Sequence, residues 1–266
     1  MQSPLKTRDR QAGLDFARLY DDHSEYAARR QEGSFEQERI RIEVNEFKLP
    51  QFAKLCPPNW QPTRLLEIGC ATGELIAAFP CRPGCYRVGV DISPANIEVA
   101  RARFPDVPFV SGDFRNLDEL DFDAVILSDV LEHVEEDANF LANAARHGNR
   151  VLVNLPLEDN WLNRGRAYGP NDISGHLRRY SLEQGLDLFR KAGLEVLSYH
   201  QVWIHETPAE ASRRELRRRH FGSAYSGPTL RRMAKATVFS LARAVPAFGK
   251  RLFESNLFVS ACRPSR

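Results

Sequence analysis

The chain has no long apolar run, and cysteine is scarce in it. No window approaches the ~20 consecutive apolar residues that a membrane-spanning helix needs, and the opening MQSPLKTRDRQ does not resemble a signal peptide. No segment repeats and none is of low complexity. These absences favour an ordinary soluble protein and make the cytoplasm the expected location.

The few cysteines exclude two kinds of scaffold. Five cysteines, an odd number at uneven spacing, indicate reduced thiols instead of a disulfide framework. Cys81 and Cys85 frame the turn CRPGC, which is half of a common metal-binding pattern. Because no second cysteine pair or histidine pair stands at a matching distance, the sequence predicts no metal site.

The composition is that of one globular domain with an uneven charge. The 266 residues are 42% hydrophobic and 27% charged, enough for one large core, so we expect a single α/β domain over 1–266. The net charge is +2. Between Glu206 and Glu254, however, eleven cations stand against four acids, which gives this segment +7 and the remainder −5.

Strand and helix patterns alternate through the middle of the chain. Short β-rich apolar runs separated by helical segments predict a parallel sheet covered on both faces, with right-handed crossovers. The expected strands are 63–68, 86–91, 107–112, 122–127, 150–155, 193–203 and 255–263, and the expected helices between them are 74–79, 94–104, 135–146 and 181–193. Ser181 begins the last of these helices with a capping-box partner at Gln184, and Gly193 ends it.

Three segments surround this alternating core. LDFARLYDDHSEYAARR and SFEQERIRIEVNEFKLPQFAKL read as amphipathic helices, which predicts an N-terminal helical cap over 1–58 before a core over 59–204. A basic helical insertion over 205–254 then precedes the last strand, 255–266.

The stretch RLLEIGCATGEL, residues 64–75, reads as a strand, a glycine turn and a helix. In an open parallel sheet, ligands bind outside the carboxyl ends of the strands, and glycine lets the backbone approach them closely. A dinucleotide site would use G-x-G-x-x-G, whereas here Gly69 and Gly73 are four residues apart and Glu67 precedes them. A carboxylate at this place would repel a pyrophosphate but would suit a cationic ligand.

In motif order over about residues 60–200, the sequence resembles the class I S-adenosylmethionine-dependent methyltransferases. EIGCATG resembles the acid-x-Gly-x-Gly-x-Gly loop of that family, with an alanine at the middle glycine, and FDAVILSDVLEHVEE is close to many of its small-molecule enzymes. The resemblance implies that Asp91, which closes VGVD, accepts both ribose hydroxyls and that Asp113 contacts the adenine amino group. The cofactor-binding residues it implies are Glu67, Gly69, Cys70, Ala71, Gly73, Asp91, Ile92, Asp113, Phe114, Ser128, Asp129 and Val130. Each alone would also suit a solvated turn, but their order on successive strand ends favours a cofactor site.

The resemblance also implies a fold and an activity. The fold is a Rossmann-like, doubly wound, seven-stranded, mostly parallel sheet whose last strand is antiparallel. The activity is methyl transfer from S-adenosylmethionine to a small molecule or glycan, at oxygen in preference to nitrogen, with S-adenosylhomocysteine as product. Two alternatives are a partner subunit that binds the cofactor without turnover and a Rossmann oxidoreductase of the NAD type.

Candidate residues for the acceptor follow the fourth and fifth strands. His133, in LEHV, is either the general base for a hydroxyl acceptor or a residue that packs the next helix. The segment 156–180 has no regular period, and its length and aromatic content indicate a functional loop, an acceptor wall. Its candidate residues are Trp161, Tyr168, His176, Arg178 and Tyr180. The arginines would bind an anionic group of the acceptor or, as we favour for Arg178 and Arg179, form structural salt bridges.

The basic insertion contains an amphipathic pattern, TLRRMAKATVFSLARAV, residues 229–245. Such a helix usually packs on its own domain, which we favour. The alternative is peripheral contact of residues 212–251 with an anionic membrane surface. The core offers no nucleic-acid recognition motif, so no nucleic-acid partner is expected.

Overall fold

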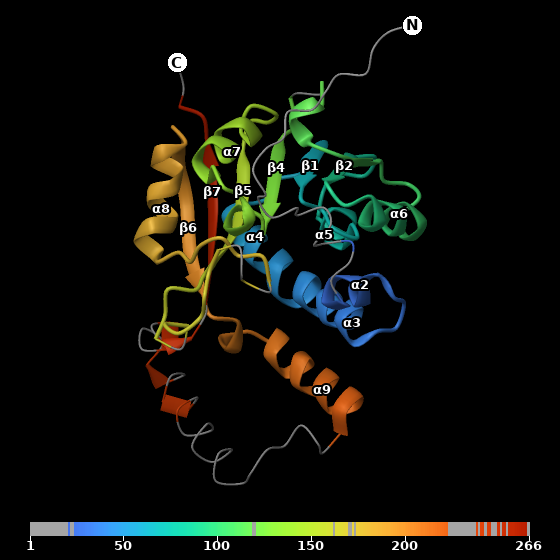
Figure 1. The fold of residues 1–266 in the computed structure, drawn as a ribbon. Helices are drawn as coiled ribbons and strands as arrows, with labels where there is room; N and C mark the ends of the chain where they lie inside the picture. Colours follow the sequence, from blue (N-terminus) through green and yellow to red (C-terminus); the bar gives the residue numbers. More distant parts are fainter. Residues whose placement is uncertain are drawn as a thin grey trace, which may run out of the picture.

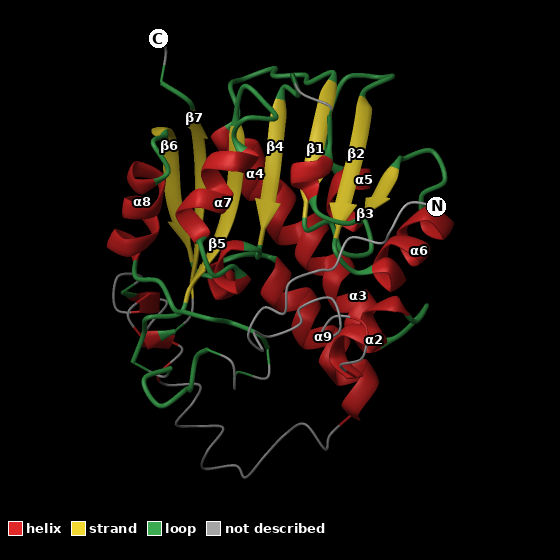
Figure 2. Cartoon of the chain, turned by 45° about the horizontal axis from the view of Figure 1, so that its top comes forward, coloured by secondary structure: helices red, strands yellow, loops and turns green. Residues whose placement is uncertain are grey.

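One seven-stranded sheet with helices on both faces forms the centre of the molecule (Figures 1 and 2). A computed structural model provides this fold. It describes residues 21, 24–118, 121–161, 163–169, 172, 174–222, 238, 240–241, 244–245, 249–250, 252–253 and 255–264. Within these residues, no helix has the length and apolar character needed to cross a lipid bilayer.

The sheet has the expected seven strands. Its strands are β1 (Arg64–Ile68), β2 (Tyr86–Asp91), β3 (Phe109–Ser111), β4 (Ala124–Ser128), β5 (Val151–Leu157), β6 (Glu195–Val202) and β7 (Ser255–Cys262). Their order is β3-β2-β1-β4-β5-β7-β6, with parallel pairing from β3 to β5 and antiparallel pairing of β7 with both neighbours. The mostly parallel sheet with an antiparallel last strand is therefore confirmed. Strand order reverses between β1 and β4, where ligands bind in sheets of this kind.

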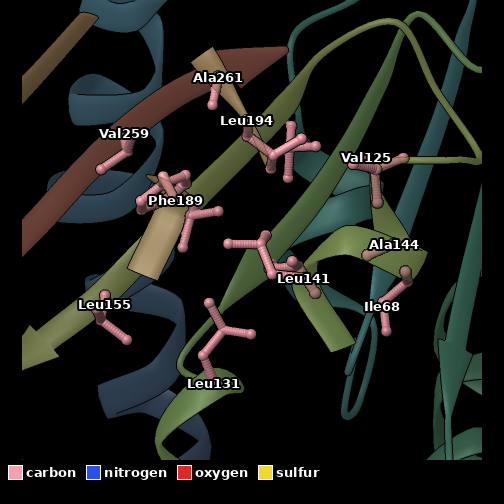
Figure 3. Close-up of a cluster of buried hydrophobic side chains, with 14 of the residues drawn as sticks. Ile68, Val125, Leu131, Leu141, Ala144, Leu155, Phe189, Leu194, Val259 and Ala261 are labelled. Carbon is pink, nitrogen blue, oxygen red and sulfur yellow. The ribbon is translucent and has the colours of Figure 1, made fainter. Parts of the chain in front are cut away.

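Both faces of the central strands are buried, which explains their continuous apolar runs. Every residue of β4 and β5 is buried, whereas the edge strand β6 has no buried residue and alternates between exposed and partly buried residues from Glu195 to His200. On one face, Leu141 and Phe189 pack beside Ile68, Val125 and Leu155 (Figure 3). The helices of this face are α7 (Asp137–Ala144) and α8 (Leu182–Lys191).

The opposite face of the sheet is covered by one helix that precedes β1 in the chain and two helices that follow it. Phe52, Ile76 and Ile97 form a second buried cluster there with Leu65 and Ile126. The helices that supply these residues are α4 (Leu49–Leu55), α5 (Glu74–Ala78) and α6 (Pro94–Arg103). The alternation of Leu65 with Leu66, and of Val125 with Ile126, between the two clusters follows the two-residue period of a strand.

The second N-terminal helix is continuous but changes type along its length. It consists of α3 (Phe35–Ile42), a π-helical segment η1 (Glu43–Lys48) and α4. Ser34 caps the beginning by accepting from the Gln37 amide at 3.1 Å. Proline lacks an amide hydrogen and crowds the preceding turn, so the wider π turn directly before Pro50 accommodates it without ending the helix. Lys48 lies in this π segment, a type of turn that is frequent at functional sites.

The predicted boundaries of α8 are confirmed. Ser181 and Gln184 form the reciprocal capping box, and Gly193 follows the end of the helix with φ +70°. Both bonds are local, which is why the sequence pattern alone was sufficient to predict them.

The insertion between β6 and β7 contains the basic helix α9 (Ala209–Phe221). Together with α3 and α2 (Ser24–Arg30), it lies beyond the carboxyl ends of the parallel strands (Figures 1 and 2). Arg219 pairs with Glu38 at 2.9 Å, and Arg213 approaches Glu43 at 3.6 Å. Two cations of α9 thus pair with acids of the N-terminal helices, whereas Arg214 and Arg218 pair within α9 and stay largely exposed. The amphipathic pattern predicted over 229–245 lies largely outside the described residues.

Candidate functional site

The glycine turn between β1 and α5 holds a left-handed backbone at three positions. Gly69 has φ +76°, Ala71 has φ +45° and Gly73 has φ +86°. The amides of Gly69 and Cys70 both donate to the Val90 carbonyl, at 2.8 and 3.0 Å, which ties the turn to β2. At Ala71 the sequence places a side chain where left-handed backbone favours glycine, so this departure adds strain as well as a methyl group.

Asp91 fastens the same turn from the end of β2. Its Oδ2 accepts from the Ala71 amide and its Oδ1 from the Ser93 amide, each at 2.8 Å. Burial raises the pKa of Asp91, and the two amide donors oppose that rise. Because each carboxylate oxygen has two lone pairs, both oxygens keep acceptor capacity for a ligand.

Three ionisable groups, one of them from η1, meet at the carboxyl ends of β1 and β4. Glu67 is buried, and its Oε2 has no hydrogen-bond partner. Burial raises the pKa of Glu67 to about 8, against the opposing effect of the Lys48 ammonium. Lys48 reaches across from η1 to Asp129, with Nζ 2.6 Å from Oδ2. Burial alone would raise the pKa of Asp129, but Lys48 outweighs it and lowers that pKa.

These groups line one cavity of about 1140 Å³. Of the predicted cofactor residues, it is lined by Glu67, Gly69, Cys70, Ala71, Asp91, Ile92, Asp113, Phe114, Ser128, Asp129 and Val130. Gly73 does not line it. A Cβ at Gly73 would come within 2.6 Å of the Phe109 ring, so close packing accounts for that glycine. The fold therefore brings the predicted residues of four strand ends to one cavity.

Asp113 and Phe114, which follow β3, make contacts with other side chains of the protein. The Asp113 carboxylate forms an ion pair with Arg115, which lowers the pKa of Asp113. The Phe114 ring packs edge to face on Phe140, with centroids 4.8 Å apart. An adenine contact through Asp113 would therefore share its carboxylate with Arg115.

Several cationic residues that no sequence motif marks also line the cavity. Lys48 comes from the π segment, and Arg29, Arg39 and Arg213 come from the N-terminal helices and α9. The Arg39 guanidinium is held by Glu36 and Glu43. No motif marks these positions, because they reach the cavity only through the packing of α3, η1 and α9.

Only one of the predicted acceptor-wall residues lines the cavity, and that is His176. Trp161 is 60% exposed. The guanidinium carbon of Arg166 lies over the ring of Tyr168, 4.8 Å from the ring centre. Arg178 forms an ion pair with Asp137, and the Tyr180 hydroxyl lies 2.8 Å from an oxygen of the same carboxylate. This pairing agrees with the structural salt bridge favoured for Arg178, and an acceptor role for the four residues outside the cavity lining stays a prediction.

A buried polar network holds His176. Its Nδ1 lies 2.6 Å from Glu158 Oε2, and the other oxygen of Glu158 accepts from Arg166, also at 2.6 Å. Arg166 in turn forms two hydrogen bonds with Asp172, at 2.7 and 2.9 Å. Asp172 Oδ1 then accepts from the Ser174 amide at 2.9 Å, which shapes the loop that carries His176.

His133 lies in the short 3-10 turn η3 (Leu131–His133), directly after β4. Its Nδ1 donates to the Gly175 carbonyl at 3.0 Å, since a carbonyl oxygen can only accept. Burial, and after it the nearby His176, lowers the pKa of His133 to about 4. The rings of His133 and His176 meet edge to face, with centroids 4.7 Å apart.

Glu132 completes a group of three at this place. One ligand atom from each of Glu132, His133 and His176 lies within 4.8 Å of the other two. No cysteine takes part, and the two histidines are far apart in sequence. Regular spacing of cysteine or histidine pairs in the sequence therefore does not mark this group.

Comparison with known proteins finds similarity over the middle of the chain. Residues 66–150 match the family model described as a methyltransferase domain. Ubiquinone biosynthesis O-methyltransferase of Rhodopseudomonas palustris (strain TIE-1) is 34% identical over 106 residues, which are 37% of this chain and 41% of that protein. Trans-aconitate 2-methyltransferase of Escherichia coli O7:K1 (strain IAI39 / ExPEC) is 28% identical over 156 residues, 54% of this chain and 61% of that protein. The chain thus spans less than two thirds of either relative.

A solved structure has the same fold. It is phosphoethanolamine N-methyltransferase 2 of Haemonchus contortus in complex with phosphomonomethylethanolamine and S-adenosylhomocysteine. The TM-score is 0.63 at 16% sequence identity, and the likeness covers 95% of this chain and 61% of that one.

Proposed function

Because the chain belongs to the class I S-adenosylmethionine-dependent methyltransferases, we propose that it transfers a methyl group from S-adenosylmethionine to a small-molecule or glycan acceptor. We place the transfer at oxygen in preference to nitrogen. The observation that carries the proposal is the joint position of the glycine turn, Glu67 and Asp91 around one cavity at the point where strand order reverses.

The residues present fit this cofactor. The unpartnered Oε2 of Glu67 suits a cationic group, and the open lone pairs of Asp91 suit a ribose diol. Asp113 and Phe114 would lie along the adenine. When bound, S-adenosylmethionine supplies an electrophilic methyl carbon on a sulfonium.

The chain's own contribution to such a reaction is alignment and the exclusion of water. The turn, fixed by Gly69 and Asp91, would set the position of the cofactor. Lys48 and the helices α3 and α9 would cover the cavity from the side beyond the strand ends. On the acceptor side, the Glu158, Arg166 and Asp172 network would hold the loop of His176 in place.

A hydroxyl acceptor would have to lose its proton, and His133 by itself is a weak base for that step. The sequence makes His133 a candidate general base, and this histidine does line the cavity. A pKa near 4, however, makes its imidazole a weaker proton acceptor than an ordinary histidine, since general bases work best near the operating pH. The general-base role of His133 stays a prediction.

Two alternative functions remain, a nicotinamide oxidoreductase and a subunit that only binds the cofactor. The turn lacks the G-x-G-x-x-G spacing of dinucleotide sites and carries Glu67 where a pyrophosphate would bind, which speaks against a nicotinamide oxidoreductase. A binding-only subunit would hold the cofactor but form no product.

Product mass tests the proposal. The full chain is incubated with S-adenosylmethionine carrying a trideuterated methyl group and a panel of catechols, hydroxy acids and sugar nucleotides, and products are analysed by mass spectrometry. Appearance of a trideuteromethyl product together with S-adenosylhomocysteine supports the enzyme. Tight S-adenosylhomocysteine binding with neither product across the panel would favour the binding-only subunit.

A further inference from the structure

Glu132 is a buried carboxylate with no hydrogen-bond partner. Its side chain is 1% exposed, and neither Oε1 nor Oε2 is bonded to any described donor. An isolated charge in such surroundings is costly, and buried carboxylates are normally paired or bound to metal. Glu132 nevertheless lines the cavity, so a ligand held there would lie beside its carboxylate.

Two imidazoles lie beside this carboxylate. His133 Nε2 is 3.8 Å from Glu132 Oε1, and His176 approaches from the loop before α8. In each ring Nδ1 is engaged, by the Gly175 carbonyl in His133 and by Glu158 in His176. A neutral imidazole with its proton on Nδ1 presents Nε2 as a lone pair. Histidines that bind metals are oriented in the same way, by a carbonyl or carboxylate on the far nitrogen.

We propose that Glu132, His133 and His176 bind one divalent transition-metal ion in the part of the cavity that they line. Two imidazole nitrogens and one carboxylate suit Mn²⁺, Co²⁺ or Zn²⁺ better than Mg²⁺ or Ca²⁺, which prefer oxygen ligands. Three protein ligands leave a coordination position for an acceptor oxygen. Ligand atoms around such an ion are roughly 3–4 Å apart, and the three ligand atoms here all lie within 4.8 Å of one another, so a small movement of the side chains suffices.

The role of this ion in the reaction rests on the proposed function, and it assigns His133 to the metal instead of to proton transfer. A hydroxyl bound to the ion loses its proton to water more readily, because a cation lowers the pKa of an oxygen that it binds. The oxygen then forms its bond to the methyl carbon as the carbon–sulfur bond breaks. The electron pair of that bond stays on sulfur, so S-adenosylhomocysteine leaves as a neutral thioether and one proton is released.

Co²⁺ titration tests the site without any need for activity. The full chain is stripped with EDTA, dialysed and titrated with Co²⁺, with calorimetry and visible absorption as readouts. We expect one Co²⁺ per chain, and a loss of affinity of about 100-fold or more in Glu132→Gln and in His176→Ala. Matched controls are Glu183→Gln, an exposed acid of α8, and His220→Ala, an exposed histidine of α9, which should bind as the parent does. Circular dichroism confirms that each variant is folded, and Glu132→Gln keeps the shape of the side chain.

The outcomes separate this inference from the proposed function. Absence of one-to-one Co²⁺ binding, or binding that Glu132→Gln and His176→Ala leave unchanged, overturns the metal site. S-adenosylhomocysteine binding is measured on the same metal-free protein. If that binding is intact while Co²⁺ does not bind, only the metal site fails. If Co²⁺ binds at Glu132 while S-adenosylhomocysteine does not, the metal site stands and the proposed function fails.

Discussion

Replacing Gly69 by alanine should destabilise the chain more than the same change at Gly84. The two glycines have nearly the same backbone, with φ +76° and +77°. A Cβ at Gly84 would have nothing within 4 Å, whereas a Cβ at Gly69 would lie 2.6 Å from Val130 Cγ2. The pair therefore separates backbone strain, which both variants share, from steric overlap, which only Gly69→Ala creates.

The magnitudes follow from these two effects. Left-handed backbone costs an alanine roughly 1–2 kcal/mol, and overpacking adds about 1–3 kcal/mol. Gly69→Ala should thus lose roughly 3 kcal/mol of unfolding free energy and Gly84→Ala about 1.5 kcal/mol. For a chain of this size the falls in Tm are about 6–12 °C and 3–6 °C. Gly69→Ala should also weaken S-adenosylhomocysteine binding, since the turn then shifts away from Val130.

Thermal denaturation followed by circular dichroism measures both variants, and a third variant isolates the overlap. Val130→Ala removes the Cγ2 atom, so the double variant Gly69→Ala/Val130→Ala should lose less than the sum of the two single losses. Equal destabilisation at Gly69 and Gly84, or strict additivity in the double variant, would refute the placement of the turn against the end of β4.

Three further predictions concern the cofactor, the pH dependence and the insertion. Asp91→Ala should raise the Kd for S-adenosylhomocysteine about 10- to 1000-fold by calorimetry, because each hydrogen bond to a charged acceptor contributes ~1.5–3 kcal/mol, while exposed Asp106→Ala should leave it unchanged. In the folded chain, burial raises the pKa of Glu210 but His205 and Arg214 outweigh it and bring that pKa down to about 2, so its contribution is present above about pH 5 and is lost as pH falls toward 2. Glu210→Gln should therefore cost about 1–2 kcal/mol at pH 7 in urea denaturation and almost nothing near pH 2, and a cost that does not shrink on acidification would contradict the ion pairing. For the insertion, sedimentation with anionic liposomes at low salt should show no binding of the full chain if its cations pack on the domain, whereas salt-sensitive binding that is lost when 212–251 is replaced by a short linker would establish the membrane contact.

Local patterns explain why much of the fold could be predicted. The strands of the core are short apolar runs, and the turn after β1 contains glycines where the backbone is left-handed. The capping box of α8 needs only Ser181 and Gln184, three residues apart. Asp91 and Asp129 could be placed together because the carboxyl ends of parallel strands meet at one edge of the sheet.

The remainder of the site depends on contacts between distant segments. Lys48 reaches Asp129 only because a π-helical turn and α4 pack across the sheet. His176 meets His133 through a loop whose shape is set by Arg166 and Asp172. None of these contacts leaves a periodic or regularly spaced pattern. The contacts of Arg178 and Tyr180 with Asp137 likewise leave no such pattern in the sequence.

Calorimetric titration of the full chain with S-adenosylhomocysteine, with NAD⁺ as the comparison ligand, tests the central claim most directly. A cavity built from the glycine turn, Glu67 and Asp91 for a methyl-donor cofactor predicts one-to-one binding of S-adenosylhomocysteine and no heat with NAD⁺. Binding of NAD⁺ alone, or no binding of S-adenosylhomocysteine by the folded protein, would contradict it.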